Sequence, residues 1–377
     1  MVYLDNSATT RPSQAVRDAM VHSMEEVYFN PSALYGPAMQ AEKELTAARK
    51  ALADQLGVPA KNVIFTSGGT ESDNLAILGH LQTLRGKGEV LYTAAEHAAV
   101  KNACREAEAR FGCKAVEIPL TREGSVDLEA LEGMLSENTA MICVMQVCNE
   151  TGVIMPIAEI AALRDRLAPK AVLHVDGVQG FMRLPFSLKK LGVQSYALSG
   201  HKIHGPKGVG ALYVRRGYNL APVFLGGGQE QKRRPGTENV AYIAAMARAI
   251  ERMLADRGRA GRIAALNKTL RDALAGMPGI VLNSPADALP ELVNFSVEGV
   301  KSETMLHFLE SRDVYVSSGS ACSRGEASHT LTAMGLPKSR VDTALRVSFS
   351  GESTPEDVRA LLDALAEGMR TLAKIRR

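Results

Sequence analysis

The segment NVIFTSGGTESDNLAILGHLQTL, residues 62–84, contains an apolar run, a glycine-rich turn and a helical stretch. Residues 62–66 are typical of a buried strand, and the spacing over 72–84 predicts a helix. The same order recurs up to about residue 214. Strands that alternate with helices predict an α/β fold with a mostly parallel sheet covered on both faces. Six further strands are predicted at 89–93, 114–118, 140–147, 171–176, 195–198 and 209–214, and helices at 98–111, 127–136 and 156–167.

Helices flank this region on both sides. A helix over about 37–56 precedes it and stops at Gly57, and one long helix is predicted over about 238–275. The remainder predicts a smaller α/β domain that closes with a helix capped by Thr354. Its strands are predicted at 279–282, 291–297, 313–317 and 344–349. We expect an N-terminal segment that packs with the small domain, a large domain and the small domain, over residues 1–14, 15–255 and 256–377.

Composition excludes several classes of function. The 377 residues carry 44 Lys and Arg against 41 Asp and Glu, a net charge of +3, which argues against a surface for nucleic acid or anionic membranes. There is no Trp for a base-stacking platform. The sequence also lacks a signal peptide and an apolar run of ~18 residues, so we expect a cytoplasmic protein. The five cysteines have no spacing typical of zinc ligands, so no metal is expected.

Polar residues follow five of the predicted strands. In a parallel sheet ligands bind at the carboxyl ends of the strands, so these residues are expected to meet. Each group alone has an ordinary explanation, such as a glycine turn, a loop histidine or a solvated lysine. The five groups are Thr66–Ser72, Glu96 with His97, Asn149, Asp176 with Gln179, and Ser199–Lys202.

Together the five groups match the requirements of pyridoxal 5′-phosphate. This cofactor needs an anion site for its phosphate, a flat group over its ring, an acid for its pyridine nitrogen and a lysine for its aldehyde. A glycine-rich turn before a helix offers the anion site, and a lysine desolvated after a buried strand is suited to Schiff-base chemistry.

Longer motifs make the sequence resemble a known family. It is similar to the cysteine desulfurases of the NifS and IscS type, within the class V branch of pyridoxal phosphate enzymes of fold type I. The resemblance covers nearly the whole chain. It rests on the motifs Tyr3–Thr10, Phe65–Ser72, Glu96-His97, Asn149–Val153, His174–Asp176, Ser199–Gly208, Gly226–Gln229, Pro235–Asn239 and Ser317–Cys322.

The resemblance implies which residues hold the cofactor. Lys202 would bond to its aldehyde and carry protons, Asp176 would pair with the pyridine nitrogen, and His97 would stack on the ring as an acid or base. Gln179 and Asn149 would reach the 3′-oxygen side and the substrate. Thr237 would reach the phosphate bound by a second subunit, which implies a homodimer. The phosphate of the same subunit would be held by Gly69, Thr70, Ser199 and His201.

The resemblance also implies the substrate and the route of sulfur. Arg346 would clamp the carboxylate of L-cysteine, a task suited to a guanidinium fork, with help from Asn30. Cys322 would attack the substrate sulfur, leaving L-alanine and a persulfide for an iron–sulfur scaffold protein or a thiolation enzyme. Its loop is about two residues shorter than in long-loop relatives, which favours an acceptor that docks closely.

Cys322 differs from the other cysteines already in its sequence context. It lies in a Ser- and Gly-rich stretch beside Arg324, where a thiol is expected to be reactive. Packing roles are expected for Cys104, Cys113, Cys143 and Cys148. Three alternatives stay open at this point: a selenocysteine lyase, a class V aminotransferase, which would not need Cys322, and a non-catalytic protein that binds pyridoxal phosphate.

Overall fold

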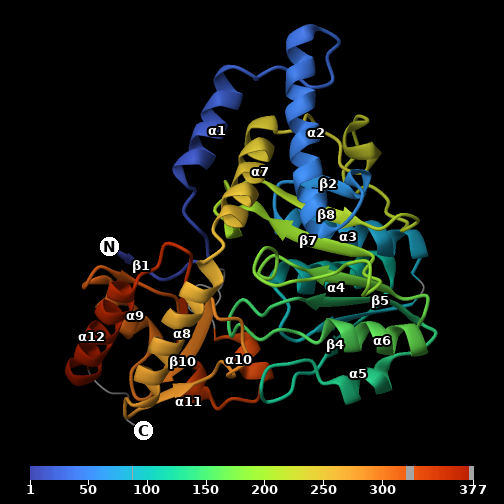
Figure 1. Ribbon diagram of the computed structural model, residues 1–377. Coiled ribbons are helices and arrows are strands. Elements are labelled where there is room, and N and C mark those ends of the chain that lie inside the picture. The colour runs from blue at the N-terminus through green and yellow to red at the C-terminus, as the bar shows by residue number, and fades with distance from the viewer. Residues whose placement is uncertain (87, 320–326, 373–377) are drawn as a thin grey trace.

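The computed structural model describes residues 1–86, 88–319 and 327–372 (Figure 1). Its main sheet has seven strands in the order β2-β8-β7-β6-β5-β3-β4, and only β8 runs antiparallel to its neighbours. The predicted α/β fold with a mostly parallel seven-stranded sheet is therefore confirmed. The strands are β2 (Val63–Thr66), β3 (Glu89–Thr93), β4 (Lys114–Ile118), β5 (Thr139–Met145), β6 (Val172–Asp176), β7 (Ser195–Ser199) and β8 (Gly210–Val214).

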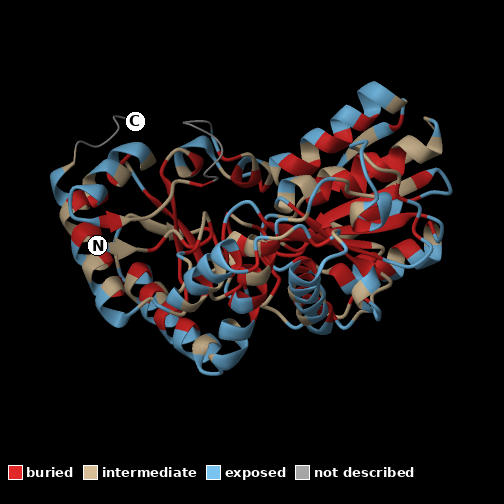
Figure 2. Ribbon diagram, turned by 90° about the horizontal axis from the view of Figure 1, so that it is seen from above, coloured by how far each residue is buried: buried red, intermediate tan, exposed pale blue. Residues whose placement is uncertain are grey.

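Helices cover both faces of this sheet because its strands alternate between two apolar clusters. In β5, Met141 and Cys143 pack with helices α3 and α4, whereas Ile142 and Val144 pack with α2, α6 and α7. Figure 2 shows the buried strands between helices whose outer faces are exposed. The covering helices are α2 (Gly36–Leu56), α3 (Gly69–Leu81), α4 (Ala98–Phe111), α5 (Leu128–Met134), α6 (Ile157–Leu167) and α7 (Val240–Ala255), and α1 (Gln14–Glu25) packs on α7.

The C-terminal part forms a second core around a three-stranded antiparallel sheet. The N-terminal strand joins this part of the molecule, because β1 pairs in parallel with β11 and Leu4 is fully buried in the same core. The strands are β1 (Val2–Tyr3), β9 (Ile280–Leu282), β10 (Leu292–Val297), β11 (Val314–Tyr315) and β12 (Ala344–Ser348). The helices are α8 (Arg259–Ala275), α9 (Ser302–Glu310), α10 (His329–Ala333), α11 (Lys338–Val341) and α12 (Pro355–Thr371).

The long helix predicted over 238–275 is wrong. It is broken into α7 and α8 at Asp256, whose backbone leaves the helical region with ψ of 73°. The Asp256 carboxylate accepts a hydrogen bond from Arg262 at 2.6 Å, and Gly258 follows as the N-cap of α8. Asp and Gly both disfavour a continuous helix, so the helix breaks here although the apolar spacing continues across the break. The division of the chain into three parts, with its boundary at 255/256, stays a prediction.

Other predicted boundaries agree closely with the structure. Gly57 ends α2 in the left-handed conformation, with φ of 65°, and Thr354 forms a capping box with Asp357 at the start of α12. Strand β1 and the short helices α10 and α11 had no prediction, because two to five residues carry too little periodicity. In the described ranges, none of the helices is both long and apolar enough to span a membrane.

We expect Gly210→Ala to destabilise the main sheet. A Cβ at Gly210 would lie 2.5 Å from the carbonyl oxygen of Leu198 and 2.7 Å from the Cα of Gly68, both backbone atoms. The free energy of unfolding should fall by about 1–3 kcal/mol, measured by urea denaturation. Gly133→Ala in α5 is the matched control, since nothing lies within 4 Å of its Cβ position. Equal stability of the two variants would contradict the expectation.

Candidate active site

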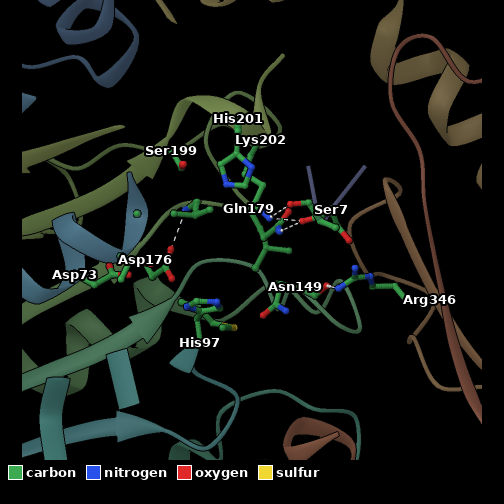
Figure 3. Close-up of a pocket in the computed structure, with 16 residues that line it drawn as sticks. Ser7, Asp73, His97, Asn149, Asp176, Gln179, Ser199, His201, Lys202 and Arg346 are labelled. Carbon is green, nitrogen blue, oxygen red and sulfur yellow. Dashed lines mark hydrogen bonds between the residues drawn. The ribbon is translucent and has the colours of Figure 1, made fainter. Parts of the chain in front are cut away.

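A cavity of about 220 Å³ lies where the carboxyl ends of β5, β6 and β7 meet the N-terminus of α3 (Figure 3). Strand β12 of the C-terminal part closes it with Arg346. The lining includes most of the residues predicted for the site: Gly69, Thr70, His97, Asn149, Asp176, Gln179, Ser199, His201, Lys202 and Arg346. The structure thus brings these ten residues together in one cavity, and their roles stay predictions.

Lys202 ends a short turn, Gly200–Lys202, that follows β7. Its Nζ donates to the backbone carbonyl of Ser7 and, at 2.9 Å, to that of Ala8. Burial, followed by the positive charges of Arg346 and Arg183, lowers the pKa of Lys202 from 10.5 to about 7. A substantial fraction of this amine is therefore neutral and nucleophilic near neutral pH.

Asp176 is the last residue of β6, and His97 caps the N-terminus of α4. The Asp176 carboxylate accepts from the Val178 amide at 2.9 Å, and the His97 Nδ1 accepts from the Ala99 amide at 3.1 Å. Burial raises the pKa of Asp176, whereas the nearby His97 and the Val178 amide lower it. Burial also lowers the pKa of His97. A bound cation beside Asp176 would favour the charged carboxylate.

The N-terminus of α3 forms a cradle for an anion. A second hollow, shared with the main cavity through Gly69, Thr70, Ser199 and His201, opens at this end of the helix. Gly68, its N-cap, has φ of 155° and no side-chain cap, and a Cβ at Gly69 would lie 2.7 Å from Val178 Cγ2. The helix dipole and the cation Lys207 on the lining both favour a negatively charged ligand.

Arg346 is 1% exposed, and its guanidinium is already held on two sides. Its Nη2 forms an ion pair with Asp5 at 2.8 Å, and its Nη1 donates to the backbone carbonyl of Asn149 at 3.0 Å. Its Nε is buried and has no acceptor among the described residues. A guanidinium has five N–H bonds, so these contacts leave capacity for a further carboxylate.

Gln179 connects the pocket to two neighbouring segments. Its Nε2 donates to the Ser7 carbonyl at 2.9 Å, and its Oε1 accepts from Arg183 at 2.6 Å. His201 is held by contact of its Nδ1 with the Thr9 hydroxyl at 3.2 Å, and burial lowers the pKa of His201 to about 4. With the contacts of Lys202 and Arg346 given above, the N-terminal segment thus contacts four residues of the pocket.

A buried polar cluster lies behind Asp176. His174 Nε2 is 3.2 Å from the Asp73 carboxylate, and its Nδ1 is 2.9 Å from the Ser195 hydroxyl. Burial raises the pKa of Asp73 and lowers that of His174 to about 3. Burial raises the pKa of Glu96 to about 8 as well. His174 and Glu96 are therefore largely uncharged at neutral pH.

Two of the described residues that were predicted for the site do not reach this cavity. Asn30 and Thr237 are exposed and lie outside its lining. Cys322 lies outside the described residues. The other cysteines, at 104, 113, 143 and 148, are buried in the apolar cores, as the sequence predicted.

Sequence reasoning missed three features of the site. Ser7 and Ala8 act through backbone carbonyls, and Asp5 pairs with a residue 341 positions away. Their only signal in the sequence was the motif over Tyr3–Thr10, in which no residue was assigned a function. Arg183 had no signal, because it lies in a turn after the motif that contains Asp176.

Comparisons with known proteins match this chain to one family over nearly its full length. The family model described as aminotransferase class-V matches residues 2–361. A NifS/IcsS protein homolog of Lactobacillus delbrueckii subsp. bulgaricus is 38% identical over 100% of this chain and 99% of its own length. Cysteine desulfurase IscS of Methanosarcina thermophila is 38% identical over 98% of this chain and 92% of its own length. A solved NifS-like protein has a TM-score of 0.93 at 32% identity and covers 98% of this chain and 100% of its own.

We expect Lys202 to react as an amine of low pKa. In protein freed of carbonyl cofactors with hydroxylamine, acetic anhydride labelling of Lys202 should have its midpoint near pH 7, because burial and two arginines disfavour the charged form. Mass spectrometry of the Lys202 peptide follows the reaction across pH. The exposed Lys50 and Lys268 in the same digest are references. A Lys202 midpoint above about pH 9, within reach of the ordinary lysine value, would contradict the expectation.

Proposed function

The chain belongs to the cysteine desulfurases of the class-V aminotransferase family, and on that premise we propose which of its residues carry the reaction and where the sulfur goes. Cysteine desulfurases convert L-cysteine to L-alanine and transfer the sulfur to acceptor proteins. The observation that carries the assignment is the Lys202 amine of lowered pKa, which shares one cavity with the buried Asp176 and Arg346.

The residues present fit pyridoxal phosphate. Gly68 and Gly69 at the N-terminus of α3 have no Cβ, which leaves room for a phosphate to approach the backbone. Thr70, Ser199 and His201 line the same hollow. Lys202 supplies the amine for the aldehyde, and Asp176 the acid that keeps the pyridine nitrogen protonated. When bound, the cofactor supplies an electron sink for charge that develops on the substrate Cα.

The chain's own groups move protons and orient the substrate. The low pKa of Lys202 lets its neutral amine remove the Cα proton near neutral pH, and the resulting ammonium can return a proton. Its contacts with the Ser7 and Ala8 carbonyls hold the amine in the cavity. His97 would lie against the ring of the bound cofactor and would serve as an acid or base.

Arg346 binds the substrate carboxylate. Asp5 and the Asn149 carbonyl orient the guanidinium and occupy two of its N–H bonds, while the buried Nε and the second hydrogens of both terminal nitrogens stay available to a carboxylate. The Asn149 side chain also lines the cavity and contacts the substrate.

Cys322 takes the sulfur. Its thiolate forms an S–S bond with the substrate sulfur while the C–S bond breaks, and the electron pair of that bond stays with the organic fragment, which becomes L-alanine after protonation. Cys322 then carries a persulfide for a protein acceptor in the cytoplasm, either an iron–sulfur scaffold or a thiolation enzyme. The short stretch after Cys322 favours an acceptor that docks close to the cavity.

The decisive experiment follows ³⁵S from labelled L-cysteine. Wild-type protein should release L-alanine and hold ³⁵S as a persulfide on the Cys322 peptide. Cys322→Ser should lose persulfide and reduce alanine release by about 100-fold or more, because no thiolate attacks the sulfur. Cys113→Ser is the control, since Cys113 is buried in the main core and lies outside the cavity lining.

Two results would contradict the assignment. Transfer of the amino group to an oxo acid that persists in Cys322→Ser would indicate an aminotransferase. An absorption band of lysine-bound cofactor without alanine release would indicate a non-catalytic protein. Separate assays with cysteine and with selenocysteine, each read by alanine release, distinguish a selenocysteine lyase.

The active form is a homodimer in which Thr237 contacts the phosphate of the cofactor bound by the partner subunit. Thr237 is exposed and outside the cavity of its own chain. Large apolar residues are exposed on the corner between α1 and α2, where Leu34 is 100% exposed, and Leu225 is 91% exposed. Such apolar surface is typical of a subunit interface. Asn30, on the same corner, contributes to substrate binding in the assembled dimer.

Mixed dimers test the role of Thr237. Lys202→Ala protein should be inactive, and Thr237→Ala should bind the cofactor about tenfold more weakly, since a phosphate contact is lost. Subunits exchanged between the two variants form hybrids with one intact cavity, provided Thr237 acts across the interface. At limiting cofactor, desulfurase activity should therefore exceed that of both parents. Activity no higher than the sum of the parents would contradict it.

A further inference from the structure

Arg183 is a partly buried cation next to the pocket. It lies in the turn after β6, outside the cavity lining. Its Nη1 donates to Gln179 Oε1 at 2.6 Å, and its Nη2 donates to the backbone carbonyl of Lys202 at 3.0 Å. Burial lowers its pKa to about 10, so it stays charged at neutral pH.

Stability does not explain this charge. Glu291, the acid whose charge acts on Arg183, forms its ion pair with Arg259 at 3.3 Å instead. A partly buried cation that donates only to neutral oxygens has no ion pair to offset the cost of its desolvation. Both oxygens that Arg183 contacts belong to residues of the pocket, Gln179 and Lys202.

The contact with Gln179 fixes the direction of its amide. A guanidinium can only donate, so the Gln179 atom beside Arg183 has to be the carbonyl oxygen. The NH₂ group of Gln179 is then turned toward Ser7, whose carbonyl accepts from it at 2.9 Å. With its oxygen occupied and one N–H bonded to Ser7, Gln179 offers the pocket its remaining N–H, so the ligand atom that meets it is a hydrogen-bond acceptor.

The contact with Lys202 works through the backbone. Arg183 holds the carbonyl of Lys202, while the Lys202 amine and the Gln179 amide meet on the Ser7 carbonyl. The four residues therefore form a closed ring of hydrogen bonds with the guanidinium as its one permanent charge. Replacing Arg183 would remove one hydrogen bond from Gln179 and one from the Lys202 backbone at the same time.

We propose that Arg183 is a positioning residue for the desulfurase reaction, which orients Gln179 as a donor and fixes the backbone from which Lys202 extends. The inference rests on the proposed roles of Gln179 and Lys202 toward the cofactor. Arg183 itself does not touch the substrate.

Charges on several elements act on the Lys202 amine besides Arg183. After burial, Arg346 on β12 and Arg183 lower its pKa, whereas Asp5 and Asp176 raise it. His201 and His97 also face it, because its charge lowers their pKa values. Loss of the Arg183 charge therefore raises the pH at which the amine releases its proton.

Arg183→Met and Arg183→Lys separate charge from geometry in the holoenzyme. For Arg183→Met we expect the absorption band of lysine-bound cofactor to titrate about one pH unit higher, and kcat to fall about tenfold or more. KM for cysteine should stay within about twofold of wild type. Arg183→Lys keeps the charge but cannot reach both oxygens, so kcat should fall while the titration midpoint stays near that of wild type.

A double-mutant cycle tests whether Arg183 acts through Gln179. Arg183→Met should reduce kcat less in a Gln179→Ala background than in wild type, because the oriented amide is already absent. Arg370→Met, an exposed arginine on α12, is the control and should leave both kcat and the titration unchanged.

The proposal is overturned if Arg183→Met, or Arg183→Lys where Arg183→Met does not fold, keeps kcat within about twofold of wild type. It is also overturned if Arg183→Met folds and only its melting temperature falls, which would make the role of the residue purely structural. Failure of the proposed function has a different signature. In that case Lys202→Ala would retain the activity, whatever the Arg183 variants do.

Discussion

The site depends on keeping the amine of Lys202 out of water beside two arginines. Burial and the charges of Arg346 and Arg183 act in the same direction, so the amine is partly neutral near pH 7. An amine in this state needs hydrogen-bond acceptors without strong negative charge. The carbonyls of Ser7 and Ala8 provide them, and the acids Asp5 and Asp176 only partly offset the arginines. The surrounding turns, strand ends and N-terminal segment are arranged around this requirement.

Much of the fold could be predicted because its signals are local. Apolar runs and helical spacing recur with the period of a covered parallel sheet, and glycine at 57 and threonine at 354 mark helix ends. The exception was the region 238–275, where apolar periodicity continues through Asp256 although its conformation breaks the helix. Periodicity reports which faces are buried, and it does not report a change of helix axis. Strand β1 was missed because two residues gain their conformation only from β11.

The candidate site was predictable where function lies in side chains at strand ends, as for Lys202, Asp176 and His97. It was not predictable where the chemistry uses the backbone or a distant partner. Any residue could provide the carbonyls at positions 7 and 8, so their identity carries no signal. The pairing of Asp5 with Arg346 joins the two ends of the chain, and the role of Arg183 depends on which atoms a turn brings within reach.

The first strand has a consequence for how the protein is made. Asn6 donates to the carbonyl of Ser348 at 2.9 Å, and the Ser7 amide donates to the Ser348 hydroxyl at 2.8 Å. The segment that touches Lys202 therefore leaves the ribosome well before Ser348, on which its position depends. A nascent chain can hold all seven strands of the main sheet while the contacts of this segment with β12 are still missing. Completion of the pocket therefore depends on a contact that forms only after β12 has been made.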